Sequence, residues 1–132
     1  MKRKIDIQSE ISNIRKIEAL IDELSSELKI NREAYGKILV ATMEAVNNAI
    51  IHGNKTDNTK FVSVNFTIQE SRLMVTVEDE GKGFNPELIP DPTAPSNIEN
   101  LHGRGVYLMT NLADNIEFNS SGNQVRMVFN IA

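Results

Sequence analysis

The 132-residue sequence contains no cysteine, so neither a disulfide framework nor a thiolate metal site can form. It has no apolar run near the about 18 residues that a membrane-spanning helix needs, so we expect no membrane partner. Positive charge is not in excess either, and the net charge of −4 argues against direct nucleic-acid binding. The basic residues 2–4 are followed by Ile5-Asp6-Ile7-Gln8 and not by the apolar segment of a signal peptide, which predicts a cytoplasmic protein.

The composition is that of an ordinary globular protein, with 40% hydrophobic and 24% charged residues. A chain of this length can bury most of its apolar surface in one core. The sequence contains no internal repeat and no low-complexity segment. We therefore expect a single domain over residues 1–132.

Apolar spacing near the start of the chain predicts a strand followed by a helix. Residues 4–8 alternate as in a short strand, and residues 14–28 carry apolar side chains at helical spacing. Ser9 or Ser12 is expected to cap this helix, because a serine hydroxyl can accept a hydrogen bond from the first free amides.

A second helix and a hairpin are expected next. Asn31 is a candidate cap for a helix that continues to Ile50 and is ended by Gly53-Asn54-Lys55. Residues 62–68 and 73–78 alternate between apolar and polar side chains, which predicts two strands that pair as a hairpin.

All four prolines fall between Pro86 and Pro95, so this segment is expected to be a loop. A long loop in a compact domain is usually a lid or a binding segment. Residues 103–114 are expected to form a third helix, and residues 116–118 and 125–131 two final strands. The element order predicts an α/β (α+β) two-layer sandwich, with a mixed, mostly antiparallel sheet and about three helices on one face.

Three polar residues form a stripe on the second helix. Glu44, Asn48 and His52 are spaced four residues apart, so their side chains project to the same side. The neighbouring positions are largely apolar, which favours a buried helix, and a buried Glu needs a partner such as a metal, a water or a ligand. A solvated edge of an amphipathic helix explains the same stripe, and the spacing alone leaves both interpretations open.

Asp79 lies at the end of the second strand of the hairpin. It is in phase with the apolar residues of that strand, so its side chain is expected to point toward the helices. A carboxylate there can accept a hydrogen bond from an exocyclic amine such as that of adenine. Asp-x-Gly is also common in turns, so a turn residue is the alternative.

Gly103, Arg104 and Gly105 are expected to precede the third helix. The free amides and the dipole at a helix start favour an anion such as phosphate, and Arg104 would add positive charge. As an isolated Gly-x-Gly, the segment is explained equally well as a flexible hinge.

Taken in order, these motifs resemble those of the GHKL (Bergerat-fold) ATPases, and within them the anti-sigma factor serine/threonine kinases of the sporulation and stress-response type. Residues 44–53 resemble the N-box of that family, residues 79–86 its first glycine box, residues 90–95 its lid and residues 102–105 its second glycine box. The likeness covers essentially the whole chain, and it implies the Bergerat ATP-binding fold.

The resemblance also implies roles for individual residues. Asn48 would ligate Mg²⁺ through its side-chain oxygen, and Glu44 would act as the base or orienting group for the attacking hydroxyl. Asp79 would bind the adenine amine, with Gly81 and Gly83 making room for the base.

The second glycine box, Gly103, Arg104 and Gly105, would hold the β and γ phosphates. One motif departs from the family, because Gly122-Asn123-Gln124 stands where many relatives have Gly-Thr. Asn123 or Gln124 is expected to take over the threonine's contact near adenine.

The implied function is that of an ATP-dependent protein serine/threonine kinase that also binds a sigma factor. The implied substrate is a serine on a STAS-type anti-anti-sigma protein, the implied cofactors are ATP and Mg²⁺, and a homodimer is allowed. The alternative is a nucleotide-gated sigma or STAS binding module with little or no catalysis. A histidine-kinase fragment is disfavoured, because the only histidines, His52 and His102, both belong to the expected nucleotide site.

Overall fold

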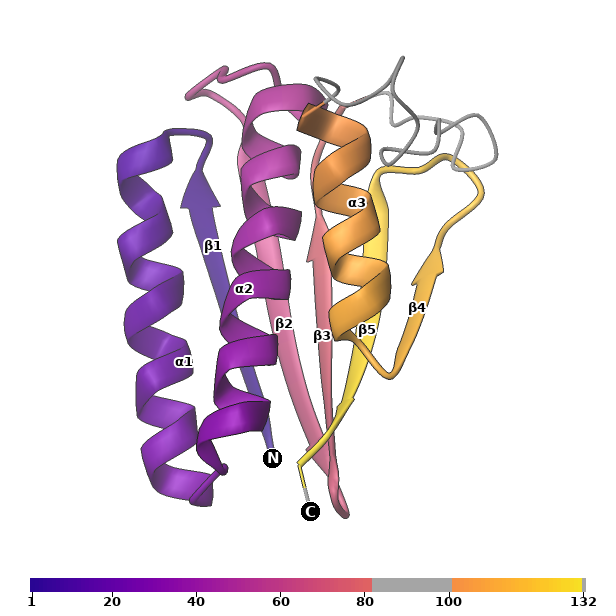
Figure 1. Cartoon of the computed structure of the whole chain (residues 1–132). Coiled ribbons are helices and arrows are strands. Elements are labelled where there is room, and N and C mark those ends of the chain that lie inside the picture. Colours follow the sequence, from indigo (N-terminus) through magenta and orange to yellow (C-terminus); the bar gives the residue numbers. More distant parts are fainter. Residues whose placement is uncertain (82–100, 132) are drawn as a thin grey trace.

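The computed structural model describes residues 1–81 and 101–131, and for residues 101–106 the backbone alone. In this part of the chain, a five-stranded sheet is covered on one face by three α-helices (Figure 1). In chain order the elements are β1 (Lys2–Gln8), a 3₁₀ turn η1 (Ile11–Asn13), α1 (Ile14–Leu28), α2 (Arg32–Asn48), a π-helical turn η2 (Ala49–Gly53), β2 (Phe61–Gln69), β3 (Arg72–Glu78), α3 (Leu101–Leu112), β4 (Asn115–Phe118) and β5 (Gln124–Asn130). The predicted two-layer α+β architecture is confirmed.

The strands lie in the order β1-β2-β3-β5-β4, and each neighbouring pair in this sheet is antiparallel. The expectation of a mixed sheet is therefore wrong for the described strands. The reason is topological: β2 and β3 are joined by a hairpin, as are β4 and β5, and α3 returns the chain so that β5 runs antiparallel to β3.

The predicted alternation along the strands sets which face is buried. Successive side chains of a strand point to opposite faces, so one set faces the helices and the other faces solvent. The inward set of β2 and β3 is at most 2% exposed, and it comprises Val62, Val64, Phe66, Leu73, Val75 and Val77. The helices contribute their own apolar stripes to this core, including Ile17, Ile21 and Leu24 of α1 and Ile38, Ala45 and Val46 of α2.

The two helix-cap predictions have different outcomes. The cap at Asn31 is confirmed, because its side-chain oxygen accepts a hydrogen bond from the Ala34 amide at 2.8 Å. The cap at Ser9 or Ser12 is wrong, because Ser12 lies inside η1 and α1 follows Asn13 without a side-chain cap. Ser9 is fully buried, and its hydroxyl donates instead to the carbonyl oxygen of Lys60 at 2.8 Å.

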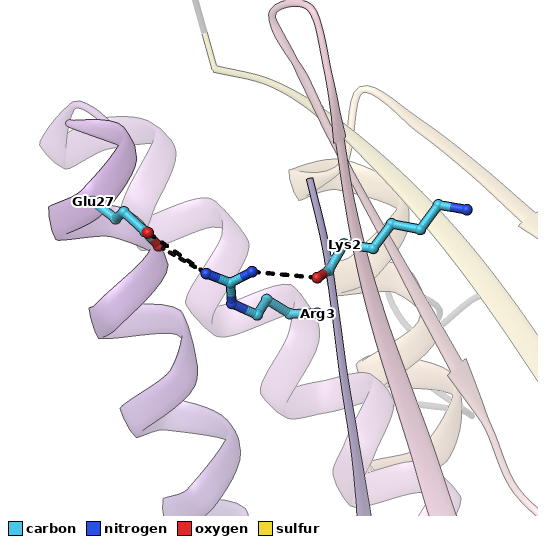
Figure 2. Close-up of polar contacts among 3 residues, drawn as sticks. All are labelled: Lys2, Arg3 and Glu27. Atoms are coloured by element: carbon cyan, nitrogen blue, oxygen red, sulfur yellow. Dashed lines mark hydrogen bonds and ion pairs between the residues drawn. The ribbon is translucent and has the colours of Figure 1, made fainter.

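A polar contact ties the edge strand to the helical layer. The guanidinium of Arg3 in β1 lies 3.4 Å from a carboxylate oxygen of Glu27 in α1, and it also donates to the carbonyl of Lys2 (Figure 2). Both side chains are largely exposed, so the ion pair contributes at most about 1 kcal/mol. The packing of α1 therefore depends mainly on its buried apolar stripe.

The helical segment after Asn31 ends at Gly53, as predicted, but its last turn is wider than an α-helix. The Asn54 amide donates to the carbonyl of Ala49, five residues earlier, at 2.8 Å. Single π-helical turns of this kind are rare and often occur at functional sites. The turn places the end of this segment beside the end of β3.

Two further expectations concern the segment after β3. The predicted proline-rich lid, residues 86–95, lies outside the described residues. The third helix spans Leu101–Leu112, so it begins two residues earlier than predicted. No helix in the described ranges is long and apolar enough to cross a membrane.

Candidate functional site

A pocket opens at the end of the molecule where α2 and β3 finish and β5 begins. Its apolar lining includes Val77, Met109, Phe118 and Val125. Polar side chains of Asn48, His52, Asp79 and Asn123 also line it. An apolar cavity with a few converging polar groups is the usual form of a small-molecule site.

Asp79 lies where the sequence predicts it, at the end of β3 and facing the helical layer. Its carboxylate accepts a hydrogen bond from the Gly81 amide at 2.7 Å. Burial raises the pKa of the Asp79 carboxyl above its usual value, and the hydrogen bond from Gly81 opposes this shift. A partly desolvated carboxylate is a strong acceptor for an amine that enters the pocket.

Gly53 and Gly81 bring two backbone segments into direct contact. A Cβ atom built on Gly81 would lie 2.1 Å from the carbonyl oxygen of Gly53, and one built on Gly53 would lie 2.3 Å from Cγ of Asp79. Gly81 is therefore required for the packing of the β3 end against η2. The family resemblance implies for Gly81 only that it makes room for the base, so this packing role is an additional one.

Asn48 is the last residue of α2 and lines the pocket. Its side-chain nitrogen is buried and has no hydrogen-bond partner among the described residues. Buried polar atoms are nearly always paired, so this amide is suited to a bound ligand. Rotation of the amide by half a turn exchanges nitrogen and oxygen, so Asn48 can offer an oxygen ligand as well as a donor.

Glu44 lies one helical turn before Asn48, but it does not line this pocket, and its side chain is partly exposed. The expectation that α2 is buried on most sides is wrong on the side of Val40, which is 44% exposed. Solvent exposure thus increases along the stripe: Glu44 and Asn48 are half-buried, and His52 is exposed. Both interpretations of the stripe hold in part, because it is solvated at its edge and lines a pocket at Asn48.

The structure describes only some of the residues of the two glycine boxes. Gly83 lies outside the described residues. Gly103, Arg104 and Gly105 lie inside α3 and not before it, because the helix begins at Leu101. Gly103 is still in the first turn, where backbone amides lack helical partners.

Asn123 and Gln124 both line the pocket, and Asn123 is the one that contacts Asp79 itself. The carbonyl oxygen of Asn123 accepts from the Asp79 amide at 2.9 Å, and its side-chain nitrogen donates to the Asp79 carbonyl at 3.3 Å. Its side-chain oxygen accepts from Asn119 at 2.6 Å and from Ser121 at 2.9 Å. Gln124 instead donates to Glu78 at 3.0 Å. Asn123 therefore holds Asp79 in place through the main chain.

One polar residue near the site, Asn54, is 1% exposed and is not predicted from the sequence as part of it. It follows the helix-ending Gly53, so its sequence context indicates only a turn. A buried Asn in that position has no sequence signal, because two of its three partners, Ser9 and Glu80, lie 45 and 26 residues away.

Comparisons with known proteins agree with this architecture. A family model described as a histidine kinase-like ATPase domain matches residues 7–129. The anti-sigma F factor of Clostridium perfringens is 38% identical over 89 residues, which are 66% of this chain and 64% of that protein. The match thus spans just under two thirds of this relative's length.

Two further comparisons cover nearly the whole chain. The serine-protein kinase RsbW of Bacillus subtilis is 31% identical over 134 residues, which cover 96% of this chain and 82% of that protein. The crystal structure of the RsbU and RsbW domains of Rv1364c from Mycobacterium tuberculosis matches with a TM-score of 0.70 and 18% identity. It covers 99% of this chain and 32% of that chain, and it shows a shared fold.

Proposed function

This chain belongs to the histidine kinase-like ATPase domain family, and from that premise we propose that it is an ATP-dependent protein serine/threonine kinase that regulates a sigma factor. Its substrate is a serine of a STAS-type anti-anti-sigma protein, and its second partner is the sigma factor, which places it in the cytoplasm. The observation that carries the proposal is the partly desolvated Asp79 carboxylate in an apolar pocket that Asn48, at the end of α2, also lines.

The pocket and Asp79 bind the adenine base. The apolar wall accepts the faces of the ring, and the Asp79 carboxylate accepts a hydrogen bond from the exocyclic amine. Guanine presents a carbonyl oxygen at the equivalent position, so the same carboxylate repels it. Gly81 keeps the β3 end close to η2, and Gly83 is the second glycine that the family resemblance assigns to the base.

Asn48 is the residue that would hold Mg²⁺. In the described part of the chain, no three His, Cys, Asp or Glu side chains lie together as a metal cage. Mg²⁺ commonly binds through one or two protein oxygens together with substrate phosphates and waters, so a single Asn oxygen fits this donor set. When bound, the ion supplies positive charge at the β and γ phosphates.

The remaining groups serve phosphoryl transfer. The serine hydroxyl of the partner attacks the γ-phosphorus, its proton passes to the Glu44 carboxylate, and the bond to the β–γ bridging oxygen breaks to release ADP. The first-turn amides of α3 around Gly103, together with Arg104 and Gly105, hold the β and γ phosphates. Glu44 and Asn48 are one turn apart on α2, so both act on the same end of the nucleotide.

The position of Glu44 favours one alternative function. Because Glu44 is partly exposed and lies outside the pocket lining, the protein can also be a nucleotide-gated module that binds its sigma or STAS partner without transferring phosphate. The two functions share the Asp79 pocket and differ only at Glu44.

A transfer assay separates the two functions. Purified protein is incubated with ATP, Mg²⁺ and a candidate STAS protein, and phosphoserine is detected by mass spectrometry. The matched control is the nearly isosteric variant Glu44→Gln. It should keep ATP binding, and its transfer rate should be about 10²–10⁴-fold lower. If the wild-type protein binds ATP but transfers no more phosphate than Glu44→Gln, the kinase proposal is wrong and the binding module remains.

A further inference from the structure

One buried side chain joins the ends of three strands beside the pocket. The side-chain nitrogen of Asn54 donates to the hydroxyl of Ser9 after β1 at 2.7 Å and to the carbonyl of Phe61 in β2 at 3.0 Å. Its side-chain oxygen accepts from the Glu80 amide, just after β3, at 2.8 Å. Asn54 itself is 1% exposed; its bond to Ser9 is buried, and its bonds to Phe61 and Glu80 are partly buried.

The backbone of Asn54 is fixed as well. Its amide closes the π-helical turn by donating to Ala49, and its carbonyl accepts from the Asp57 amide at 3.1 Å. The side chain therefore extends from a rigid point at the end of the α2–η2 segment. Whatever it binds is held at a set distance from that segment.

The bond to Glu80 is linked to the nucleotide pocket through the two residues that flank Glu80 in the chain. Asp79 precedes Glu80 and supplies the pocket carboxylate, and Gly81 follows it and donates to that carboxylate at 2.7 Å. A displacement of the Glu80 amide therefore moves the carboxylate and its donor together.

We propose that Asn54 is a positioning residue, which uses its side-chain oxygen to set the Asp79 carboxylate against the end of α2 so that the pocket selects adenine. This inference rests on the proposed function, because it takes Asp79 as the group that binds the base. The two polar atoms of the Asn54 amide have different roles. The nitrogen bonds the ends of β1 and β2 and stabilises the fold, whereas the oxygen binds the Glu80 amide next to Asp79.

The chain offers a matched control for this division. Ser9→Ala removes a partner of the Asn54 nitrogen and leaves the oxygen bonded to Glu80, whereas Asn54→Ala removes both. A purely structural role predicts that both variants lose stability and that neither changes nucleotide preference. The positioning role predicts that only Asn54→Ala changes it.

The test measures the affinities for ATP and for GTP by calorimetry, at a temperature where circular dichroism shows each variant folded. Asn54→Ala should bind ATP about tenfold more weakly and lose much of its preference over GTP, which is the size expected for one misplaced charge-assisted hydrogen bond. Ser9→Ala should keep the wild-type preference despite a lower unfolding temperature. The conservative variant Asn54→Asp keeps an acceptor for the Glu80 amide and should restore the preference for ATP.

The opposite results overturn the inference. If folded Asn54→Ala keeps the wild-type preference for ATP, Asn54 acts on the fold alone. A measurement on the wild-type protein also tests the contact if Asn54→Ala does not fold: the Glu80 amide proton should exchange slowly with solvent in NMR, and rapid exchange refutes the inference. If the wild-type protein shows no ATP binding at all, the proposed function fails, whatever the exchange rate of the Glu80 amide.

Discussion

Three glycines, two in the α2–η2 segment and one after β3, should respond to the same substitution in three different ways. Gly36 lies in the middle of α2, Gly53 ends η2, and Gly81 follows β3. Replacing each by alanine adds one methyl group, and the effect depends on what that group meets. The series therefore tests the packing of the α2–η2 segment against the end of β3.

Gly81→Ala should destabilise the protein, and Gly36→Ala should stabilise it. The new methyl carbon at Gly81 would lie 2.1 Å from the carbonyl oxygen and 2.6 Å from the carbonyl carbon of Gly53, and neither atom can rotate away. Such overpacking typically costs about 1–3 kcal/mol. At Gly36 nothing lies within 4 Å of the new methyl carbon, so alanine should gain about 0.5–1 kcal/mol from its higher helix propensity.

Gly53→Ala should act on the ligand more than on the fold. Its methyl carbon would lie 2.3 Å from Cγ of Asp79 and 2.3–2.7 Å from the two carboxylate oxygens. These atoms form the end of a rotatable side chain, so the carboxylate can swing aside at small cost in stability. Its new position no longer suits the adenine amine, so we expect ATP affinity to fall about tenfold or more.

Urea unfolding followed by circular dichroism and ATP titration by calorimetry measure the two effects separately. In a domain of this size, 1 kcal/mol corresponds to roughly 3–5 °C in Tm, so a thermal scan resolves the opposite signs of Gly81→Ala and Gly36→Ala. Equal stability of Gly81→Ala and the wild-type protein would contradict the close contact with Gly53. Wild-type ATP affinity in Gly53→Ala would show that the Asp79 carboxylate does not bind the nucleotide.

Three further substitutions test the polar groups of the pocket. Asp79→Asn should weaken ATP binding about ten- to a hundredfold, because a charge-assisted hydrogen bond is lost. Burial raises the pKa of the Asp79 carboxyl in the folded protein, so the folded state holds this proton more tightly than the unfolded state. As pH increases through that pKa, the stability of the wild-type protein relative to Asp79→Asn should therefore fall, and its ATP affinity should rise. Unfolding and calorimetry at several pH values check both directions. Asn48→Ala should remove the magnesium dependence of ATP binding, and an unchanged magnesium response would assign the metal to another residue. Asn123→Ala should lower the unfolding free energy by about 1–3 kcal/mol and should also lower the ATP affinity, because the Asp79 main chain loses a hydrogen bond. Unchanged ATP affinity in the folded variant would show that Asn123 stabilises only the β4–β5 turn.

The strands and helices were predictable because their apolar residues recur with the period of the local structure. The alternation that continues from Leu73 to Asp79 placed the carboxylate on the inner face, and the structure confirms it. The cap at Asn31 was also predictable, since the amide that it binds is only three residues away. Local patterns succeeded wherever the partner was local.

The missed features depend on partners that are distant in the sequence. Ser9 has the chemistry of a helix cap, but its hydroxyl donates to the carbonyl of Lys60 and accepts from the side chain of Asn54. Only the fold brings these residues near Ser9. The end of the π-helical turn packs closely against Asp79 and Gly81, residues more than 25 positions away, and no local pattern in the sequence indicates this contact. For the same reason, no local pattern distinguished Asn123 from Gln124 as the residue that holds Asp79.

The hydrogen bonds of the described residues divide the pocket into two parts with different degrees of preorganisation. At the Asp79 end, Asn54 holds the Glu80 amide, Asn123 holds the main chain of Asp79, and Gly81 holds the carboxylate. At the Asn48 end, a buried amide nitrogen has no partner within the described part of the chain. A rigid, satisfied group loses little entropy on binding and so provides selectivity, whereas an unsatisfied polar group gains most when a ligand arrives. The base should therefore determine which nucleotide binds, and the phosphate end should change most in structure when it does.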